Sequence, residues 1–490
     1  MTTSRLSGLS SGLDVDSLVK TLMSAQQTKL DKLNQQATKT TWKQEDYRSM
    51  STSIVDFRQN KLLDTYSKSA NLQAKTTSVT GNTTAVTTTA SSTATGSLAI
   101  TVNQLATAGN TKFSTGITNA NTKLSDTAMG TDTTKGGTGQ IELNGVVIQY
   151  DSDDTMADLV SKINSSSAGA TAIFNSKTGD LSISSNKTGA TGVTATGDLK
   201  AFSSTTTAGL NAKVNINGMD MEYEENSFAV NGINVTVNSL SGTGGVTNVS
   251  VKADTSKLLD TIKSFISDYN SLISKVNGET SETVYRTYAP LTDTQKESMT
   301  DDQITLWETK AKSGALRNDT TLTKMTTDLR ASSMAQVKTS AGLMNLQSIG
   351  ITTGSYTENG KLVIKDEDKL IAALTNNSTA VGELFGLSGD DKTATSTSSG
   401  IFTKMSAITN TALISMSKSA GISTTSTDLT TGFKASSELS TQLTTLDKKI
   451  SDFKEFMSRL ETSYYTKFTA METAVNKYNS LSTSLSSYSG

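Results

Sequence analysis

Clustered carboxylates are the first residues to consider for chemistry, because oxygen-rich clusters bind hard cations. Asp151, Asp153 and Asp154 lie close together in the chain. A calcium-binding EF-hand loop that started at Asp151 would need glycine at its sixth position and glutamate at its twelfth. Met156 and Lys162 stand at those positions. We therefore interpret the acidic cluster as the cap of a short helix next to a hairpin.

Two other acidic stretches contain neighbouring carboxylates, the residue type that glycoside hydrolysis uses in pairs. They are "YEEN" (Tyr223–Asn226) and "KDEDK" (Lys365–Lys369). The two catalytic carboxylates of a glycosidase flank the scissile bond and normally come from different elements, so sequence neighbours are poor candidates. In the second stretch, a helix cap at Asp366 accounts for the charges. We predict no glycosidase site at either stretch.

The residue types on which many enzymes depend are missing from the chain. It has no histidine and no cysteine, which excludes Ser-His and Cys-His nucleophiles, thiolate ligands and disulfides. The glycines of "GGTGQIELNG" precede a strand pattern instead of a helix, so they do not form a phosphate-binding loop. We therefore expect a protein that is not an enzyme, with no catalytic, cofactor-binding or metal-ligating residues.

Charge and composition exclude further classes of protein. The 44 basic and 46 acidic residues nearly cancel, and no block of lysine and arginine occurs, so we expect no nucleic-acid partner. No apolar run reaches the roughly 18 residues that a membrane span needs. The single proline, Pro290, leaves few slow isomerisations during folding. Because no secretory signal pattern is present, we expect a cytosolic protein or one exported without a cleavable signal.

Apolar residues recur at helical spacing at both ends of the chain. The N-terminal pattern predicts two helical stretches, about 14–40 and 43–69, separated by the polar run "TKTTWKQED". The C-terminal stripe begins at Leu443 and is interrupted at Lys467 by a stutter. A helix with so narrow an apolar stripe needs a partner, either the other terminal helix or another subunit. The residues expected to make these contacts are Val15, Leu18, Val19, Leu22, Leu30, Leu33, Leu446, Ile450, Phe453, Met457, Leu460, Tyr464, Phe468, Met471 and Val475.

Between the two ends the apolar period changes to two, which predicts a β-rich insertion over about 77–253. Asn144-Gly145 in "IELNGVVIQY" is the sharpest hairpin signal and suits a type I′ turn. Asn217-Gly218 marks a second turn of the same kind.

Helical periodicity returns at Thr255 and predicts a long helix with a wide apolar face. "TDDQITLWETKAKSG" begins with a Thr300…Gln303 capping box. Further helices are expected at 319–334, 366–374 and 401–418, and the Ser/Thr-rich "GISTTSTDLTTG" is expected to be a flexible loop.

These elements predict an elongated multidomain protein of the α+β class, with helices at both ends and β-rich domains inserted in the middle. We expect residues 1–42 and 438–490 to form a terminal helical, coiled-coil leg domain. Residues 43–76 and 254–437 are expected to form a helical bundle domain with a small β-hairpin. Residues 77–108 and 201–253 are expected to form an inner β domain, and residues 109–200 an outer β-rich domain with a hairpin–helix–hairpin module.

Several of these stretches resemble one family. "SGLDVDSLVKTLM", followed by "LDKL" and "DYR", resembles the start of the flagellar filament capping proteins, the hook-associated protein 2 family. "LNGVVIQY", "LVSKIN" and "GDLSIS" together are similar to a module shared by flagellins and hook-associated proteins. The stretch Tyr288–Asp319 and the terminal "KFTAMETAVNKYNSL" resemble the C-terminal region of the capping proteins. The resemblance covers nearly the whole chain, and Tyr288–Asp319 is its most specific part.

The resemblance implies a structural protein that is secreted unfolded through the flagellar type III export channel, with an uncleaved N-terminal signal. It implies an extracellular cap at the distal tip of the flagellar filament, which promotes folding and insertion of exported flagellin and prevents its loss. The implied partners are further copies of the chain in a ring of five, flagellin, the hook–filament junction protein and a type III export chaperone. No cofactor, nucleic acid or membrane is implied.

Two alternative functions remain open from the residues. The first is a flagellin-like or hook–filament junction structural protein, which would share paired terminal helices but should lack the Tyr288–Asp319 stretch. The second is an adhesin that binds host glycans through its β domains, although no residue identifies a glycan site.

Overall fold

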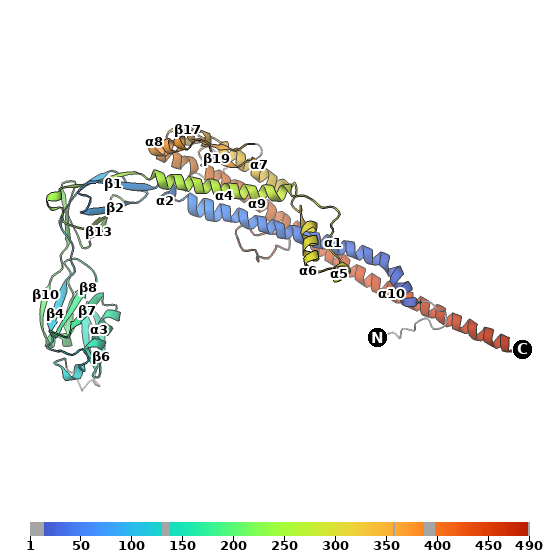
Figure 1. The fold of residues 1–490 in the computed structure, drawn as a ribbon, viewed down its shortest axis with the longest axis horizontal. Helices are drawn as coiled ribbons and strands as arrows, with labels where there is room; N and C mark the ends of the chain where they lie inside the picture. Colours follow the sequence, from blue (N-terminus) through green and yellow to red (C-terminus); the bar gives the residue numbers. More distant parts are fainter. Residues whose placement is uncertain (1–13, 130–137, 356–357, 387–396, 489–490) are drawn as a thin grey trace. The chain divides into compact units, whose positions relative to one another are not determined.

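A computed structural model describes residues 14–129, 138–355, 358–386 and 397–488. The chain divides into two compact units, one formed by Met1–Leu72 with Ser256–Gly490 and the other by Gln73–Thr255. Helices dominate the first unit and strands the second (Figure 1). The predicted α+β class, with N- and C-terminal helices flanking β-rich domains, is confirmed.

The predicted break between two N-terminal helices is wrong. A single helix α1 (Val15–Val55) runs through the polar stretch and continues directly into a π-helix, η1 (Asp56–Tyr66). The stretch contains no proline or glycine, so nothing in the backbone stops the helix. Thr40 and Thr41 in this stretch donate hydrogen bonds to carbonyl oxygens one turn earlier in the same helix, and the amide of Gln44 donates to partners outside it.

The other helices of the first unit follow the insertion, except the short α2. The helix predicted at 366–374 is longer in the structure, because α8 continues through a kink at Asn377. The elements are α2 (Ser69–Leu72), α4 (Thr255–Ser281), α5 (Asp293–Glu297), α6 (Asp301–Lys312), α7 (Thr320–Met334), η6 (Leu346–Ile349), α8 (Glu367–Phe385), α9 (Ile401–Ala420) and α10 (Glu438–Tyr488). Two small hairpins lie among them, β16 (Val337–Thr339) with β17 (Gly342–Met344) and β18 (Ile351–Thr353) with β19 (Leu362–Ile364).

An aromatic cluster forms the core of the first unit. Phe265 of α4 packs edge-on against Phe402 of α9, with ring centroids 4.9 Å apart, and against Phe385 of α8 at 5.9 Å. Tyr66 of η1 joins the cluster through Phe265 at 6.0 Å. Offset and edge-to-face aromatic pairs of this kind stabilise a core beyond their buried area. The cluster therefore ties the end of η1 to three helices that come much later in the chain.

The second unit contains two separate apolar cores. The first lies among a five-stranded and a three-stranded antiparallel sheet. The five-stranded sheet has the order β1 (Lys75–Gly81), β15 (Thr247–Ala253), β3 (Ser97–Gln104), β11 (Ala212–Ile216) and β12 (Met219–Tyr223). The three-stranded sheet has the order β13 (Ser227–Val230), β14 (Ile233–Val237) and β2 (Val86–Ala90).

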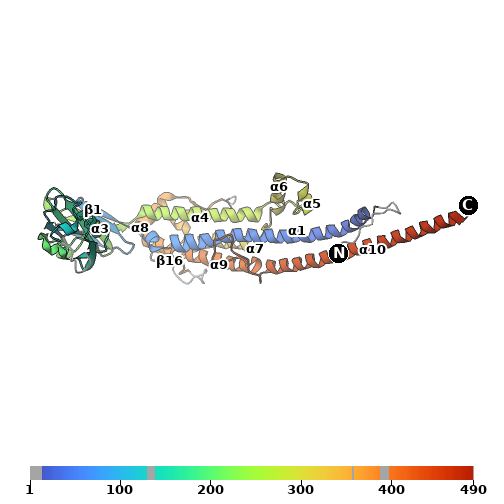
Figure 2. The ribbon, with the colours of Figure 1, turned by 90° about the horizontal axis from the view of Figure 1, so that it is seen from below.

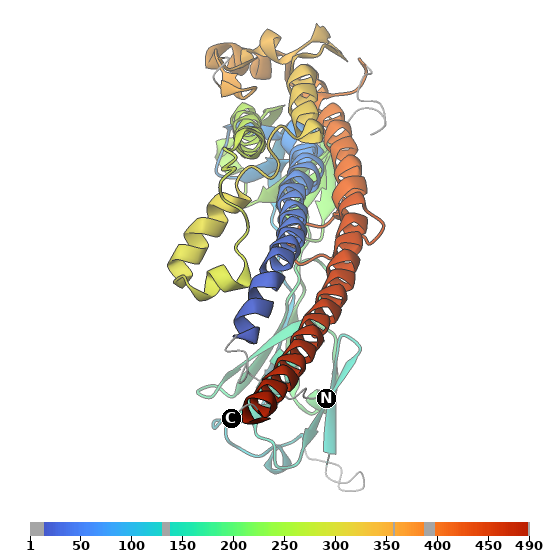
Figure 3. The same ribbon diagram turned by 90° about the vertical axis from the view of Figure 1, so that its right-hand side faces the viewer.

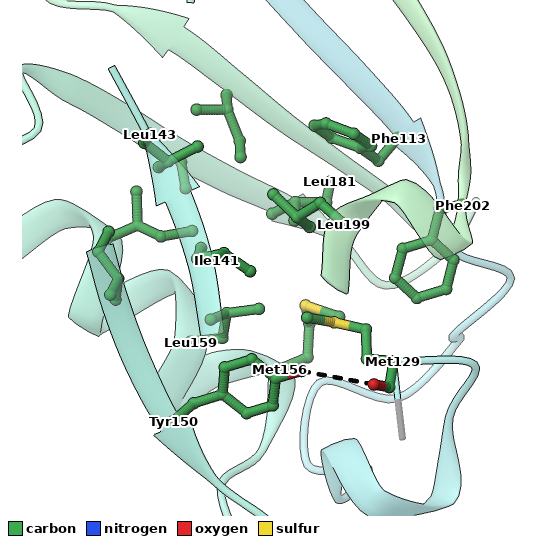
Figure 4. Packing of buried hydrophobic residues seen from close by; sticks show 14 of the residues in the cluster. Phe113, Met129, Ile141, Leu143, Tyr150, Met156, Leu159, Leu181, Leu199 and Phe202 are labelled. Atoms are coloured by element: carbon green, nitrogen blue, oxygen red, sulfur yellow. Dashed lines mark hydrogen bonds between the residues drawn. The ribbon is translucent and has the colours of Figure 1, made fainter. Parts of the chain in front are cut away.

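The second core is built around the helix α3 (Met156–Ser165), and Figure 4 shows Met156, Leu159, Ile141 and Leu181 turned toward one another within it. Its four-stranded sheet has the order β10 (Ser203–Thr207), β4 (Asn110–Ser114), β8 (Asp180–Ser185) and β7 (Ala170–Asn175). Its three-stranded sheet has the order β6 (Val146–Asp151), β5 (Thr138–Leu143) and β9 (Ala195–Gly197).

Asparagine–glycine turns connect the two strands of two hairpins, as predicted. Asn144 and Gly145, with φ of 51° and 82°, join β5 to β6, and the pair at 217–218 has φ of 53° and 87°. Positive φ at both central residues defines the type I′ turn, which matches the twist of the paired strands. A third turn of this kind, at 231–232, joins β13 to β14 and was not predicted from the sequence.

Helix α9 carries a buried lysine. Lys404 is 2% exposed, and its amine donates a hydrogen bond to the carbonyl oxygen of Gln336 at 3.3 Å. Burial lowers the pKa of the Lys404 amine below its ordinary value of 10.5. The unfolded chain therefore holds this proton more tightly than the folded chain does. The resulting cost in stability is complete below the folded-state pKa and disappears as the pH rises to 10.5.

We expect Lys404→Met to raise the free energy of unfolding at neutral pH by on the order of 1 kcal/mol, because the buried charge is removed while the volume is kept. The gain should shrink as the pH approaches 10.5. Urea unfolding of both proteins at neutral pH and near that upper value measures it. A variant that is equally or less stable at neutral pH would show that the buried amine of Lys404 does not destabilise the folded protein.

Candidate functional site

The two terminal helices, α1 and α10, lie side by side in antiparallel orientation (Figures 2 and 3). Near the start of α1, the hydroxyl of Tyr465 donates a hydrogen bond to the carboxylate of Asp16 at 2.9 Å. Near the start of α10, the amide of Gln44 donates to the hydroxyl of Ser440 at 2.9 Å. These two bonds fix the register of the pair between residues 16 and 44 of α1.

The predicted contact residues of α1 are not equally covered. Asp14 starts the helix by accepting a hydrogen bond from the backbone N–H of Ser17 at 3.0 Å, which satisfies one of the free donors of the first turn. Val15, Val19 and Leu30 are buried, and Leu33 is half-buried. Leu18 and Leu22 remain 37% and 44% exposed.

The predicted contact residues of α10 are mostly half-buried. Leu446, near the start of the helix, is buried at 4% exposure, whereas Met471 is 37% exposed. The half-buried residues are Ile450, Phe453, Met457, Leu460, Tyr464, Phe468 and Val475. The stripe therefore becomes less covered from the start of α10 toward its end.

Polar residues of α1 that the sequence did not single out anchor it to the rest of the first unit. Gln44 is 2% exposed, and its amide also donates to the carbonyl oxygen of Ala420 at 3.2 Å. The guanidinium of Arg48 lies 4.5 Å from the ring centroid of Phe433. Ser51 donates to the carbonyl oxygen of Ser423 at 2.9 Å. The Ser/Thr-rich stretch after α9, predicted to be a flexible loop, has no helix or strand, and the carbonyl oxygens of Ser423 and Thr431 within it accept hydrogen bonds from Ser51 and Arg48 of α1.

Charged groups add a second anchor between α1 and the segment that contains α6 and α7. The hydroxyl of Tyr47 donates to the carboxylate of Asp319, and burial, reinforced by Asp319, raises the pKa of Tyr47. Lys312 forms ion pairs with Asp46 at 3.2 Å and with Glu45 at 3.6 Å. Burial raises the pKa of Asp46, and Lys312 opposes this effect. The phenol of Tyr47 therefore stays protonated at physiological pH and keeps its hydrogen bond to Asp319.

Beyond Tyr465, α10 continues past the described start of α1 (Figures 1 and 2). The remaining residues to Tyr488 extend the helix by roughly 35 Å at 1.5 Å per residue. Four large apolar residues there share one face, since a helix turns about 100° per residue. We call them the distal stripe; their exposed fractions are 37% for Met471, 74% for Tyr478, 49% for Leu481 and 69% for Leu485. The same face packs against α1 further back along α10, so the stripe is a continuation of an interface.

The acidic cluster that suggested a cation site is a network of local ion pairs. Asp153 pairs with Lys123 at 2.6 Å, and Asp154 pairs with Lys162. Thr155, and not an aspartate of the cluster, caps α3, so that part of the interpretation is wrong. The cap predicted for α8 at Asp366 is confirmed.

Within the ranges that the structure describes, no group of three or more acidic, histidine or cysteine side chains is arranged to hold a metal ion. In the same ranges, no helix combines the length and the apolar character needed to cross a bilayer.

Three family models match the sequence. The model "Flagellar hook-associated protein 2 C-terminus" matches residues 209–480, which is more than half of the chain. "Flagellar hook-associated protein 2 N-terminus" matches residues 11–109, and "Flagellin hook IN motif" matches residues 131–187. The stretch Tyr288–Asp319 lies inside the C-terminal match, so the flagellin-like and junction-protein alternatives are not favoured.

Individual relatives carry the same description. The flagellar hook-associated protein 2 of Halalkalibacterium halodurans is 30% identical over 259 residues, which cover 51% of this chain and 48% of the relative. That of Thermotoga maritima is 26% identical over 267 residues, covering 51% of this chain and 41% of the relative. The chain spans about half the length of these curated relatives.

A solved structure shares the fold. The crystal structure of the D1–D2–D3 domains of the flagellar cap protein FliD from Escherichia coli matches with a TM-score of 0.55 and 24% identity. The match covers 76% of this chain and 96% of the other. At this identity the likeness concerns the fold alone.

We expect Leu446→Ala to loosen the pairing of α1 with α10 by about 2–3 kcal/mol, because the substitution leaves a cavity at a buried position. Hydrogen exchange of amides in both helices should accelerate. Leu481→Ala, at a position that is 49% exposed, is the matched control and should leave exchange within about 0.5 kcal/mol of the unmodified protein. Equal effects of the two substitutions would mean that the pairing does not depend on buried contacts.

Proposed function

The chain belongs to the flagellar hook-associated protein 2 family, and we propose on that premise that it forms a structural cap at the distal tip of a bacterial flagellar filament. In this function the protein is secreted and extracellular. It promotes the folding and insertion of exported flagellin subunits and prevents their loss. In this function the protein acts by binding other proteins, and no catalytic step is required.

The distal stripe is the observation that carries this proposal beyond family membership. Large apolar side chains that are exposed along one face of a long helix are unfavourable in water, and burying them against a partner is favourable. The stripe continues a face that already packs against a helix, so another helix fits it. We infer that the stripe contacts helical segments of flagellin at the filament end.

A stripe that is exposed before assembly would also promote aggregation. We infer that a type III export chaperone covers the C-terminal helix before export. After export, the first cap would bind the hook–filament junction protein through the same exposed face.

Several copies of the chain are needed to close over a filament end, and we propose a ring of five. Cyclic assembly uses heterologous contacts that close on themselves, so one contact type suffices. Native mass spectrometry of concentrated protein, with imaging of filament ends, measures the subunit number. A chain that stays monomeric in solution and forms no ring on filaments would refute the ring.

Leu485→Asp separates partner contact from folding, because Leu485 is 69% exposed. We expect its free energy of unfolding to change by no more than about 0.5 kcal/mol. In a strain that lacks the native gene copy, the variant should release flagellin into the medium and should not restore long filaments or swimming, because a carboxylate would be buried against an apolar partner.

Thr483→Asp is the matched control, since Thr483 lies on the opposite side of the same helical turn and is also exposed. It adds the same charge and should leave swimming intact. Normal filaments in the Leu485→Asp strain would show that the distal stripe is not the functional contact. Loss of filaments in both strains would show that the helix responds to charge alone.

A further inference from the structure

Asparagine followed by glycine is the sequence in which an asparagine side chain is most easily attacked by the next backbone nitrogen, because glycine offers no steric shield. Five such pairs occur in this chain, with asparagine at positions 144, 217, 231, 277 and 359. The hydrogen bonds that restrain the asparagine side chain and the neighbouring backbone differ among these five pairs, although glycine follows the asparagine in each.

Two of the turn asparagines are fixed by their side-chain amides. The side-chain oxygen of Asn144 accepts a hydrogen bond from the backbone N–H of Thr194 at 3.0 Å, and its amide donates to the carbonyl oxygen of Ala168 at 2.9 Å. The side-chain oxygen of Asn217 accepts from the backbone N–H of Ala99 at 2.8 Å. The backbone N–H of Gly218, which would be the attacking group, donates to Asn215 at 3.0 Å.

Two further asparagines are restrained through the backbone. Asn277 lies inside helix α4, where the following nitrogen is held in the helical ladder. The carbonyl oxygen of Asn359 accepts a hydrogen bond from the side chain of Asn277 at 2.9 Å, and that of Gly360 accepts from Tyr269 at 3.1 Å. The turn at Asn359 is thus tied to α4, although its side chain is exposed.

Asn231 is held only on the far side of its turn, where the carbonyl oxygen of Gly232 accepts a hydrogen bond from the backbone N–H of Ser91 at 2.9 Å. It lies in the type I′ turn between β13 and β14, with φ of 50°, and it is exposed. In the described part of the chain, neither its side-chain amide nor the N–H of Gly232 has a hydrogen-bond partner. Of the two strands that the turn joins, β13 is at the edge of its sheet and pairs with β14 alone among the described strands, so the turn is held less firmly on that side.

We propose that Asn231 is a site of spontaneous deamidation in the folded protein. The backbone nitrogen of Gly232 loses its proton to water and attacks the side-chain carbonyl carbon of Asn231. A carbon–nitrogen bond forms, ammonia leaves, and a five-membered succinimide results. Water then opens either carbonyl of the ring, which gives aspartate or isoaspartate at position 231. No oxidant or cofactor is consumed.

The isoaspartate product changes the fold locally, because it places an extra carbon in the main chain of a two-residue turn. That turn sets the register of Val230 against Ile233. Ile233 and Val235 of β14 are fully buried in the core of their sheets. A register change at the turn therefore weakens this core, and both products add one negative charge.

Incubation of the full chain in water labelled with oxygen-18, followed by tryptic digestion and mass spectrometry, tests the proposal. The ring-opening water leaves its label at each converted asparagine. Asn217 and Asn231 fall in the same tryptic peptide, 214–252, so their conversion is compared in one fragment spectrum. We expect label at Asn231 roughly tenfold or more ahead of Asn144 and Asn217, as the retained hydrogen bonds of those two residues predict.

The same chain unfolded in urea is the control, because the tertiary restraints are then absent. There the turn asparagines should react at similar rates. If the ratio of Asn231 to Asn217 conversion in the folded protein equals the ratio in the unfolded chain, the structural account is wrong. Faster conversion of Asn144 or Asn217 than of Asn231 in the folded protein would also overturn it.

Discussion

The antiparallel contact between α1 and α10 is the interaction on which the rest of the architecture depends. It brings together residues 449 positions apart, as the bond between Asp16 and Tyr465 shows. The whole segment between these two residues must therefore begin and end at this contact. The entropic cost of closing so long a segment grows only slowly with length, so a large insertion is tolerated once the closure exists.

The chain repeats this closure at successive levels. The hydroxyl of Tyr66 donates to the carboxylate of Asp268, which joins η1 to α4 inside the first unit. In the second unit, the first strand β1 pairs with the last strand β15, and further in β4 pairs with β10. Each later pairing closes a shorter loop than the one around it. A nested chain of this kind can carry separate cores, because each closure isolates the segment that it encloses.

A chain with only 34% hydrophobic residues must hold these closures with polar contacts as well as apolar ones. The side chains of Gln44, Arg48 and Ser51 do this on α1, each through a partner in the segment after α9 or at its flanks. A buried polar group costs little when it is paired and a great deal when it is not. Such contacts give direction and register, whereas the apolar stripe contributes through the burial of its side chains. The distal stripe lies outside this arrangement, because its free energy is gained only when a partner covers it.

The sequence alone determined those features whose cause is local. Apolar spacing predicted the terminal helices and α4, the pair Asn144-Gly145 predicted a type I′ turn, and Asp366 predicted a helix cap, because each depends on a few neighbouring residues. Tertiary structure decided the rest. Gln44, in the polar stretch of α1, finds its partner near position 440, which no local pattern indicates, and the α3 cap at Thr155 could not be distinguished from nearby aspartates. The same stripe is buried at Leu446 and exposed at Leu485, because burial depends on which helix packs against it. The apolar spacing within α10 is helical at both places, so it does not predict where the contact with α1 ends.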